Sequence, residues 1–227
     1  MRALVFSICL AFGAPAWCTD IVDVLVDSNN IRMKAHTPAA DDSARGVTIR
    51  ATWDRLIAIA RPEEAPQLQI VTGTLYAEAV MGRTVVASEA LADLTEGQRL
   101  MMLAHELGHI VLHHWDDQCR LYKRFIPGEV KPETTDPVAG RLGAAAHTQS
   151  HRHEFEADAY GYALVRRQGV DFASVMALLR SLGASQDTIT HPGTYRRVAH
   201  LREIELRSDQ EPMQATASDT GPVQAAE

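Results

Sequence analysis

The stretch HELGH at positions 105–109 lies inside an apolar run that extends from Leu100 to Trp115. Just before this run, the residues TEGQ at positions 95–98 have the Thr-x-x-Gln form of a capping box, so we expect a helix to begin there. Two residues four positions apart on a helix lie about 40° apart around the axis and about 6 Å apart along it. His105 and His109 are therefore expected to project from one face of this helix.

The two histidines have the spacing of a metal site. Their neutral ring nitrogens can bind one Zn²⁺ at about 2.0–2.1 Å, while Glu106 reaches the water on the metal without being a ligand. A catalytic zinc also needs a third protein ligand and an open fourth position. A third histidine six residues after His109 is excluded, because that position is Trp115 and the glycine that accompanies it is replaced by Leu112.

The stretch HEFEAD at positions 153–158 supplies carboxylates for the third ligand. Glu154 and Asp158 are again four positions apart and so share one helical face. We expect Glu154 to bind the metal and Asp158 to accept the other N–H of a ligand histidine. Glu156 is the alternative ligand, but only Glu154 is followed by an acid four positions later. Gly161 is small enough to let this helix approach the first one closely.

Together these stretches resemble the zinc metallopeptidase family that includes the CAAX prenyl protease, HtpX and the periplasmic protease BepA. Two further stretches agree with the resemblance, namely GRTVV at 82–86 followed by Ala90-Leu91, and His191-Pro192 with Arg197 six positions after the histidine. The resemblance covers roughly positions 67–206. Because the sequence shows no internal membrane helix and no helical repeats, it most resembles a minimal, exported, peptidase-only member.

The resemblance implies an α+β fold of the gluzincin type, mostly helical, with a small β-sheet beside the helix of positions 105–109. In a zinc peptidase, a strand such as the one at 82–86 can pair with an extended substrate by β-augmentation. The resemblance also implies that His191 and Arg197 lie over the metal, with His191 as a fourth ligand at rest or as a donor to the oxyanion. The alternative is structural: His191 merely begins the last helix and Arg197 pairs with an acid.

The composition fits one globular domain. The chain has 227 residues, 46% of them hydrophobic, and its 22 Lys plus Arg against 29 Asp plus Glu give a formal net charge of -7. An acidic chain has no basic field to hold a polyanion, so we expect no nucleic-acid partner. The 3 cysteines lack the paired spacing of a thiolate site, so any metal must be held by nitrogen and oxygen.

The first residues predict export. Positions 1–16 (MRALVFSICLAFGAPA) have the charged, apolar and small-residue order of a signal peptide. We expect an exported, periplasmic chain, soluble or loosely attached to the membrane, with a metallopeptidase domain over 17–207 and a disordered acidic tail over 208–227. An uncleaved N-terminal anchor is the alternative. The sequence leaves open whether Cys18 and Cys119 pair.

The remaining elements follow from hydrophobic periodicity and from glycine and proline. We expect a strand or helix after position 19, helices near 47–61, 150–167, 172–182 and from His191-Pro192 to about 207, and short strands at 68–71, 75–80 and 83–87 in an antiparallel meander. The segment 116–149 contains three prolines and three glycines, so we expect a long irregular connection there, and our hypothesis for its role is a lid that limits access to the site. His113 and His114 are expected as polar groups at a helix end.

The sequence therefore predicts a zinc-dependent endopeptidase that acts on misfolded or unassembled exported proteins. One Zn²⁺ would be held by His105, His109 and Glu154, and Glu106 would take the proton of the attacking water and return it to the leaving amine. The alternative is a chaperone-like or binding module that the metal merely stabilises. Glu106 favours the enzyme, because a structural site has no use for a carboxylate aimed at the water.

Overall fold

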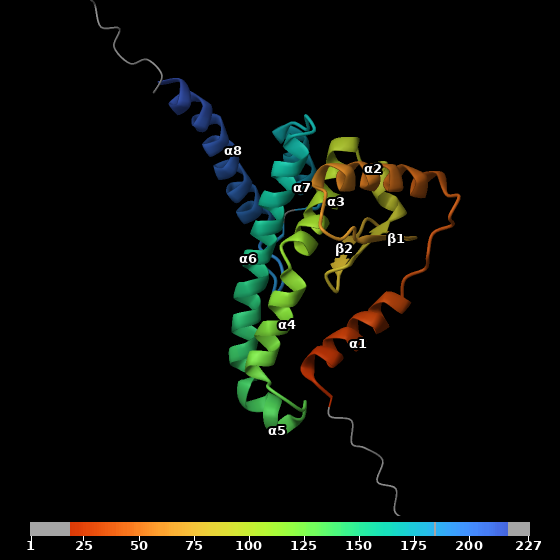
Figure 1. Ribbon diagram of the computed structural model, residues 1–227, viewed down its shortest axis with the longest axis vertical. Helices are drawn as coiled ribbons and strands as arrows, with labels where there is room; N and C mark the ends of the chain where they lie inside the picture. The colour runs from red at the N-terminus through yellow and green to blue at the C-terminus, as the bar shows by residue number, and fades with distance from the viewer. Residues whose placement is uncertain (1–18, 184, 218–227) are drawn as a thin grey trace, which may run out of the picture.

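Figure 1 shows the computed structural model of the chain, which describes residues 19–183 and 185–217. The helices are α1 (Ile21–Lys34), α2 (Ala44–Ala60), α3 (Glu96–Val111), α4 (His114–Phe125), α5 (Pro132–Thr135), α6 (Ala139–Arg166), α7 (Phe172–Ser181) and α8 (Thr194–Ala217), with the 3-10 helices η1 (Glu89–Asp93) and η2 (Asp136–Val138). The strands are β1 (Gln67–Val71), β2 (Ala77–Val80) and β3 (Thr84–Ser88). Within the described ranges, no helix is long and apolar enough to cross a membrane. The predicted signal peptide and Cys18 lie outside the described residues.

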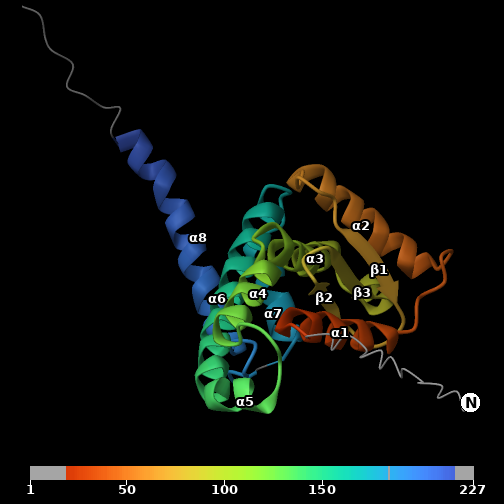
Figure 2. The ribbon, with the colours of Figure 1, turned by 60° about the horizontal axis from the view of Figure 1, so that its bottom comes forward.

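Helices α3 and α6 pack side by side at the centre of the molecule, and the sheet with α2 lies on the other side of α3 (Figures 1 and 2). The predicted capping box is present, because the Thr95 side chain accepts from the backbone N–H of Gln98 and the Gln98 side chain accepts from that of Thr95. Leu100, Leu103 and Leu107 of α3 are fully buried in the main core. Burial of this apolar helix is the main driving force that holds the two central helices together.

The sheet differs from the predicted meander. Its strand order is β1-β3-β2, with β1 parallel to β3 and β2 antiparallel to it. The physical reason is burial: Val85, Val86 and Ala87 of β3 are inaccessible to solvent, and the most deeply buried strand takes the central place. Strand β2 is left at the edge of the sheet that faces α3.

The prediction of an irregular connection over 116–149 is wrong, because α4, α5, η2 and the first part of α6 occupy most of it. Pro132 and Pro137 stand at the starts of α5 and η2, where a helix tolerates proline. Gly140 and Gly143 lie inside α6, which therefore begins eleven residues earlier than expected. The segment also packs through its own small core of Ile21, Leu121, Ile126 and Leu142. The segment is therefore a packed helical segment and not an irregular loop.

The other helices fall close to their predicted places. Helix α2 covers the expected range, α7 begins after its cap Asp171, and the first described residues form helix α1. Helix α8 starts at Thr194 and continues to Ala217, through ten positions for which the sequence predicts a disordered tail. Six of the ten residues at 208–217 are good helix formers, whereas Pro212 in the same stretch is not. The fold class is confirmed as α+β, mostly helical, with a small sheet beside the helix of His105 and His109.

Candidate active site

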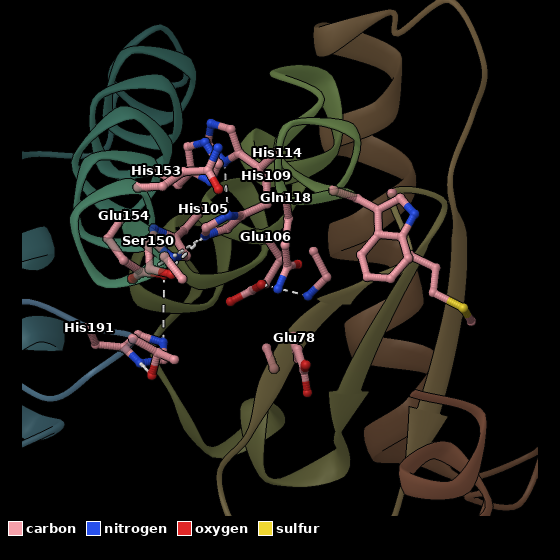
Figure 3. A pocket seen from close by; sticks show the side chains of 18 of the residues that line it. Glu78, His105, Glu106, His109, His114, Gln118, Ser150, His153, Glu154 and His191 are labelled. Carbon is pink, nitrogen blue, oxygen red and sulfur yellow. Dashed lines mark hydrogen bonds and ion pairs between the residues drawn. The ribbon is translucent and has the colours of Figure 1, made fainter. Parts of the chain in front are cut away.

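The two histidines of α3 and a glutamate of α6 converge on one point (Figure 3). The Nε2 atoms of His105 and His109 lie 3.2 Å apart. The Glu154 carboxylate places Oε2 at 3.5 Å from Nε2 of His105 and Oε1 at 3.4 Å from Nε2 of His109. The i, i+4 spacing on α3 and the packing of α6 across it thus bring together the three ligands that the sequence predicts.

The donor set fits a tetrahedral metal ion. Ligands held at about 2.0–2.1 Å in tetrahedral geometry are about 3.3–3.4 Å from one another, close to the three separations in this site. The Oε2 atom of Glu154 is buried without a hydrogen-bond partner among the described residues, a costly arrangement that a cation would relieve. Burial opposes ionisation of Glu154, but His105 and His109 outweigh it and lower its pKa, so a carboxylate faces the metal position.

The approach of α6 to α3 depends on Gly161. A Cβ atom built on Gly161 would lie 2.9 Å from the backbone nitrogen of His105 and 3.2 Å from the carbonyl carbon of Ala104. No side chain fits in that space, so the backbones of the two ligand-bearing helices contact each other directly. Glu154 stands two turns before this contact, and its position relative to His105 is therefore set by a rigid backbone contact.

A carboxylate and a guanidinium support His105 from behind. Its Nδ1 atom lies 2.9 Å from Oδ1 of Asp158, which is completely buried. Arg197 of α8 donates to both oxygens of Asp158, at 2.6 and 2.8 Å. Burial opposes ionisation of Asp158, but Arg197 overcomes it and lowers the pKa of the carboxyl group. Burial likewise opposes protonation of His105, yet the carboxylates of Asp158 and Glu154 outweigh it and raise the pKa of His105 to about 10.

Glu106 lies beside the ligand histidines and points from α3 toward the sheet (Figure 3). Its Oε2 atom accepts a hydrogen bond of 2.8 Å from the backbone N–H of Ala79 in β2. The side chain is not among the three metal-site donors, but it lines the same cavity as they do. This is the arrangement expected of a general base that acts beside a metal.

A cavity of about 670 Å³ opens in front of the ligands. Its walls are β2, the start of α4, part of α6 and the segment 189–191. His191 stands at the rim with its Nε2 atom 3.6 Å from Oε1 of Glu154, and its side chain is 59% exposed. Arg197 does not line the cavity. Its guanidinium lies behind the ligands against Asp158, which is the structural alternative that the sequence left open.

A second group of potential ligands, His114, His153 and Glu156, adjoins the first. The rings of His114 and His153 are stacked at 4.0 Å with an angle of 4° between their planes. A metal is bound in the plane of an imidazole, and no ion can lie in the planes of two parallel stacked rings. Burial, with His153 and His109 nearby, lowers the pKa of His114 to about 3, so its ring is neutral.

The sequence did not foresee the place of His114. The predicted helix runs on to Trp115, whereas α3 ends at Val111 and His113 takes a left-handed conformation with φ 57°. This turn carries the chain back, so that Nδ1 of His114 lies 2.9 Å from Nδ1 of His109. In the sequence, the signal for this contact is a histidine five positions after the ligand His109. That spacing predicts no contact unless the left-handed turn at His113 is already known.

One of three comparisons with known proteins overlaps this site. The model of Peptidase family M48 matches residues 130–205, the part of the chain that holds Glu154 and Asp158. No curated protein matches the sequence. Among solved structures, the chain is similar to S. mikatae Ste24p, with 17% sequence identity and a TM-score of 0.46. That alignment covers 80% of this chain and 56% of the Ste24p chain, so this chain spans little more than half the length of that protein.

The M48 match begins after the HELGH stretch, and the structure supplies the connection between the two parts. Glu154, inside the matched segment, meets His105 and His109, which lie before it, at distances that suit one metal ion. The chain is thus similar to Peptidase family M48 over residues 130–205, and the structure adds His105 and His109 to the Glu154 of that segment as candidate ligands of one metal ion.

Proposed function

We propose that the chain is a zinc-dependent endopeptidase that hydrolyses extended segments of unfolded polypeptides. The observation that carries the proposal is the position of Glu106, a carboxylate that lines the cavity beside His105, His109 and Glu154 without belonging to the ligand set. Two imidazoles and one carboxylate are a ligand set that suits zinc and leaves a fourth position open.

The residues of the chain divide the reaction between them. When bound, zinc supplies Lewis acidity, which lowers the pKa of a water molecule and polarises a peptide carbonyl. Glu106 accepts the proton of the attacking water and afterwards delivers it to the leaving amine. His191 stands at the rim of the cavity, where its imidazole is placed to donate to the developing oxyanion. Asp158 and Arg197 act from behind by holding the orientation of His105.

The substrate class follows from the edge strand. The sequence resemblance pointed to positions 82–86, but β3 is central and pairs with strands on both sides, so it has no free edge. Strand β2 has one, and its Ala79 N–H points away from β3 to Glu106. Residues two apart on a strand share an orientation, so Ala77 also faces outward. An extended peptide can add to this edge, whereas a folded protein offers no such segment.

The test is hydrolysis of an unstructured protein such as casein by the zinc-loaded chain. Glu106→Gln should reduce the rate by about 10²–10⁴-fold, the usual contribution of a general base, with the zinc content unchanged. Glu96→Gln is the matched control, because Glu96 lies on the same helix and, in the part of the chain that the structure describes, its side chain forms an exposed ion pair with Arg55. Undiminished activity of Glu106→Gln, or no hydrolysis by the zinc-loaded chain, would overturn the proposal.

We further propose that the chain acts after export, on misfolded or unassembled proteins of the periplasm. The support is the signal-peptide order of positions 1–16. N-terminal sequencing of protein recovered from the periplasm of producing Gram-negative cells should begin at Trp17. Recovery of the chain from the cytoplasm with Met1 intact would contradict this location.

A further inference from the structure

The two metal-site histidines are supported from behind by different groups. His105 contacts the carboxylate of Asp158, whereas Nδ1 of His109 faces another imidazole nitrogen, Nδ1 of His114, at 2.9 Å. The rings of His109 and His114 meet edge to face, with an angle of 78° between their planes. The separation of the two Nδ1 atoms is that of a hydrogen bond, so one of them must donate a proton and the other accept it.

Binding of a metal fixes the direction of this hydrogen bond. The Nε2 atom of His109 faces Glu154 and His105 in the ligand set, so a metal-bound His109 carries its single proton on Nδ1. That N–H can donate only if Nδ1 of His114 has no proton. His114 then carries its own proton on Nε2, a buried atom that forms no hydrogen bond of good geometry within residues 19–183 and 185–217 and lies 3.2 Å from Oε2 of Glu156.

The surroundings hold His114 in this orientation. Its ring is only 5% exposed and is stacked face to face on His153, so it has little freedom to rotate. His153 is itself fixed by Asp117, whose Oδ2 atom lies 3.4 Å from its Nε2. His113, the residue before His114, adopts a left-handed conformation, which is costly for any residue other than glycine. This turn of the backbone places His114 against His109.

We propose that His114 is a positioning residue for the metal site: it accepts the Nδ1 proton of His109 and so fixes the tautomer and orientation of that ligand. His114 thus does for His109 what Asp158 does for His105, except that the acceptor is an imidazole nitrogen and not a carboxylate oxygen. His153 and Glu156 hold His114 in place and do not form a second metal site. The inference rests on the proposed zinc site, but it concerns the affinity for the metal and not the turnover.

The first test is the dissociation constant for zinc, measured by competition with a chromophoric chelator. His114→Leu removes the acceptor at similar volume and should weaken binding by about 10–100-fold, as loss of an outer-shell partner usually does. His114→Asn should restore affinity to near the wild-type value, because its Oδ1 atom can accept at the place of Nδ1. His113→Asn is the control, since asparagine tolerates the left-handed conformation and the His113 ring is 72% exposed.

A second measurement needs no substitution and settles the matter if His114→Leu does not fold. Long-range ¹H–¹⁵N spectra of the zinc-loaded chain report which ring nitrogen of each histidine carries the proton. We expect the proton of His109 on Nδ1 and that of His114 on Nε2. A proton on Nδ1 of His114, or equal zinc affinity in the Leu variant and the wild type, would overturn the proposal. Absence of peptide hydrolysis would count against the proposed function alone, because neither measurement depends on activity.

Discussion

The two halves of α6 perform different tasks with different kinds of packing. The C-terminal half lies against α3, with Gly161 in backbone contact with His105, and it carries Glu154 and Asp158. The N-terminal half packs on α1 and α4 through the side chain of Leu142, and its Gly143 has nothing within contact distance of an added Cβ. The ligand-bearing half is therefore fixed by a backbone contact that leaves no room for a side chain at Gly161. The other half is held by side-chain packing around Leu142, which can adjust to a substitution.

The largest effect should come from the carboxylate of the C-terminal half. Glu154→Gln removes the negative charge from the ligand set. Loss of an outer-shell partner weakens metal binding by up to about 100-fold, and we expect the loss of this direct ligand to weaken zinc binding by more than that. The measurement is zinc retained per chain after dialysis against a weak chelator. Gln149→Ala, one turn earlier on the wall of the cavity, should retain zinc like the wild type. Equal retention by the Glu154 variant would remove Glu154 from the site.

The next effect separates rigid backbone contact from side-chain packing. Gly161→Ala forces a methyl group to within 2.9 Å of the His105 backbone nitrogen, so α6 must shift away from α3. We expect a loss of about 3 kcal/mol in the free energy of unfolding, at the upper end of overpacking penalties, together with weaker zinc binding. Urea denaturation and chelator competition measure the two effects. A variant as stable as the wild type would show that the helices do not depend on this close approach.

A smaller loss is expected in the other half. Leu142→Ala deletes most of a side chain that packs with Ile21, Leu121 and Ile126, and it should cost about 2 kcal/mol of unfolding free energy. Because this core does not contact the ligands, zinc affinity measured on the folded variant should stay unchanged. A drop in affinity comparable to that of Gly161→Ala would mean that the two halves of α6 act as one unit.

The smallest effect has the opposite sign. Gly143→Ala introduces a methyl group into open space at a helical position, so it should stabilise the chain by about 0.5–1 kcal/mol through helix propensity. A small rise in the urea midpoint with an unchanged slope is the expected result. A loss of stability would indicate that the N-terminal half of α6 is as tightly packed as the C-terminal half.

The same contrast explains how much of the molecule was predictable from sequence. The ligand stretches could be found because their chemistry depends on spacing within one helix, and the Thr95 and Asp171 caps are local signals as well. The strand order could not be found, because it depends on which strand is buried most in the finished fold. The helices within 116–149 were missed because proline at a helix start and glycine in open space look like loop signals in sequence.

The site itself was predictable in its ligands and not in its surroundings. His105, His109 and Glu154 converge as their spacing indicates, and Asp158 supports His105 from behind. Arg197 lies on the far side of Asp158 and not over the metal, because α8 crosses α6 behind the ligands. The contact of His114 with His109 depends on a left-handed residue at position 113 that no propensity predicts.

The central claim is that one metal ion is held by His105, His109 and Glu154. The most direct test is anomalous diffraction at the zinc edge from a crystal of the zinc-loaded chain. The account predicts a strong peak about 2.0–2.1 Å from both Nε2 atoms and from the Glu154 carboxylate, with none between the stacked rings of His114 and His153. A peak bounded by His114, His153 and Glu156, with the first position empty, would contradict it.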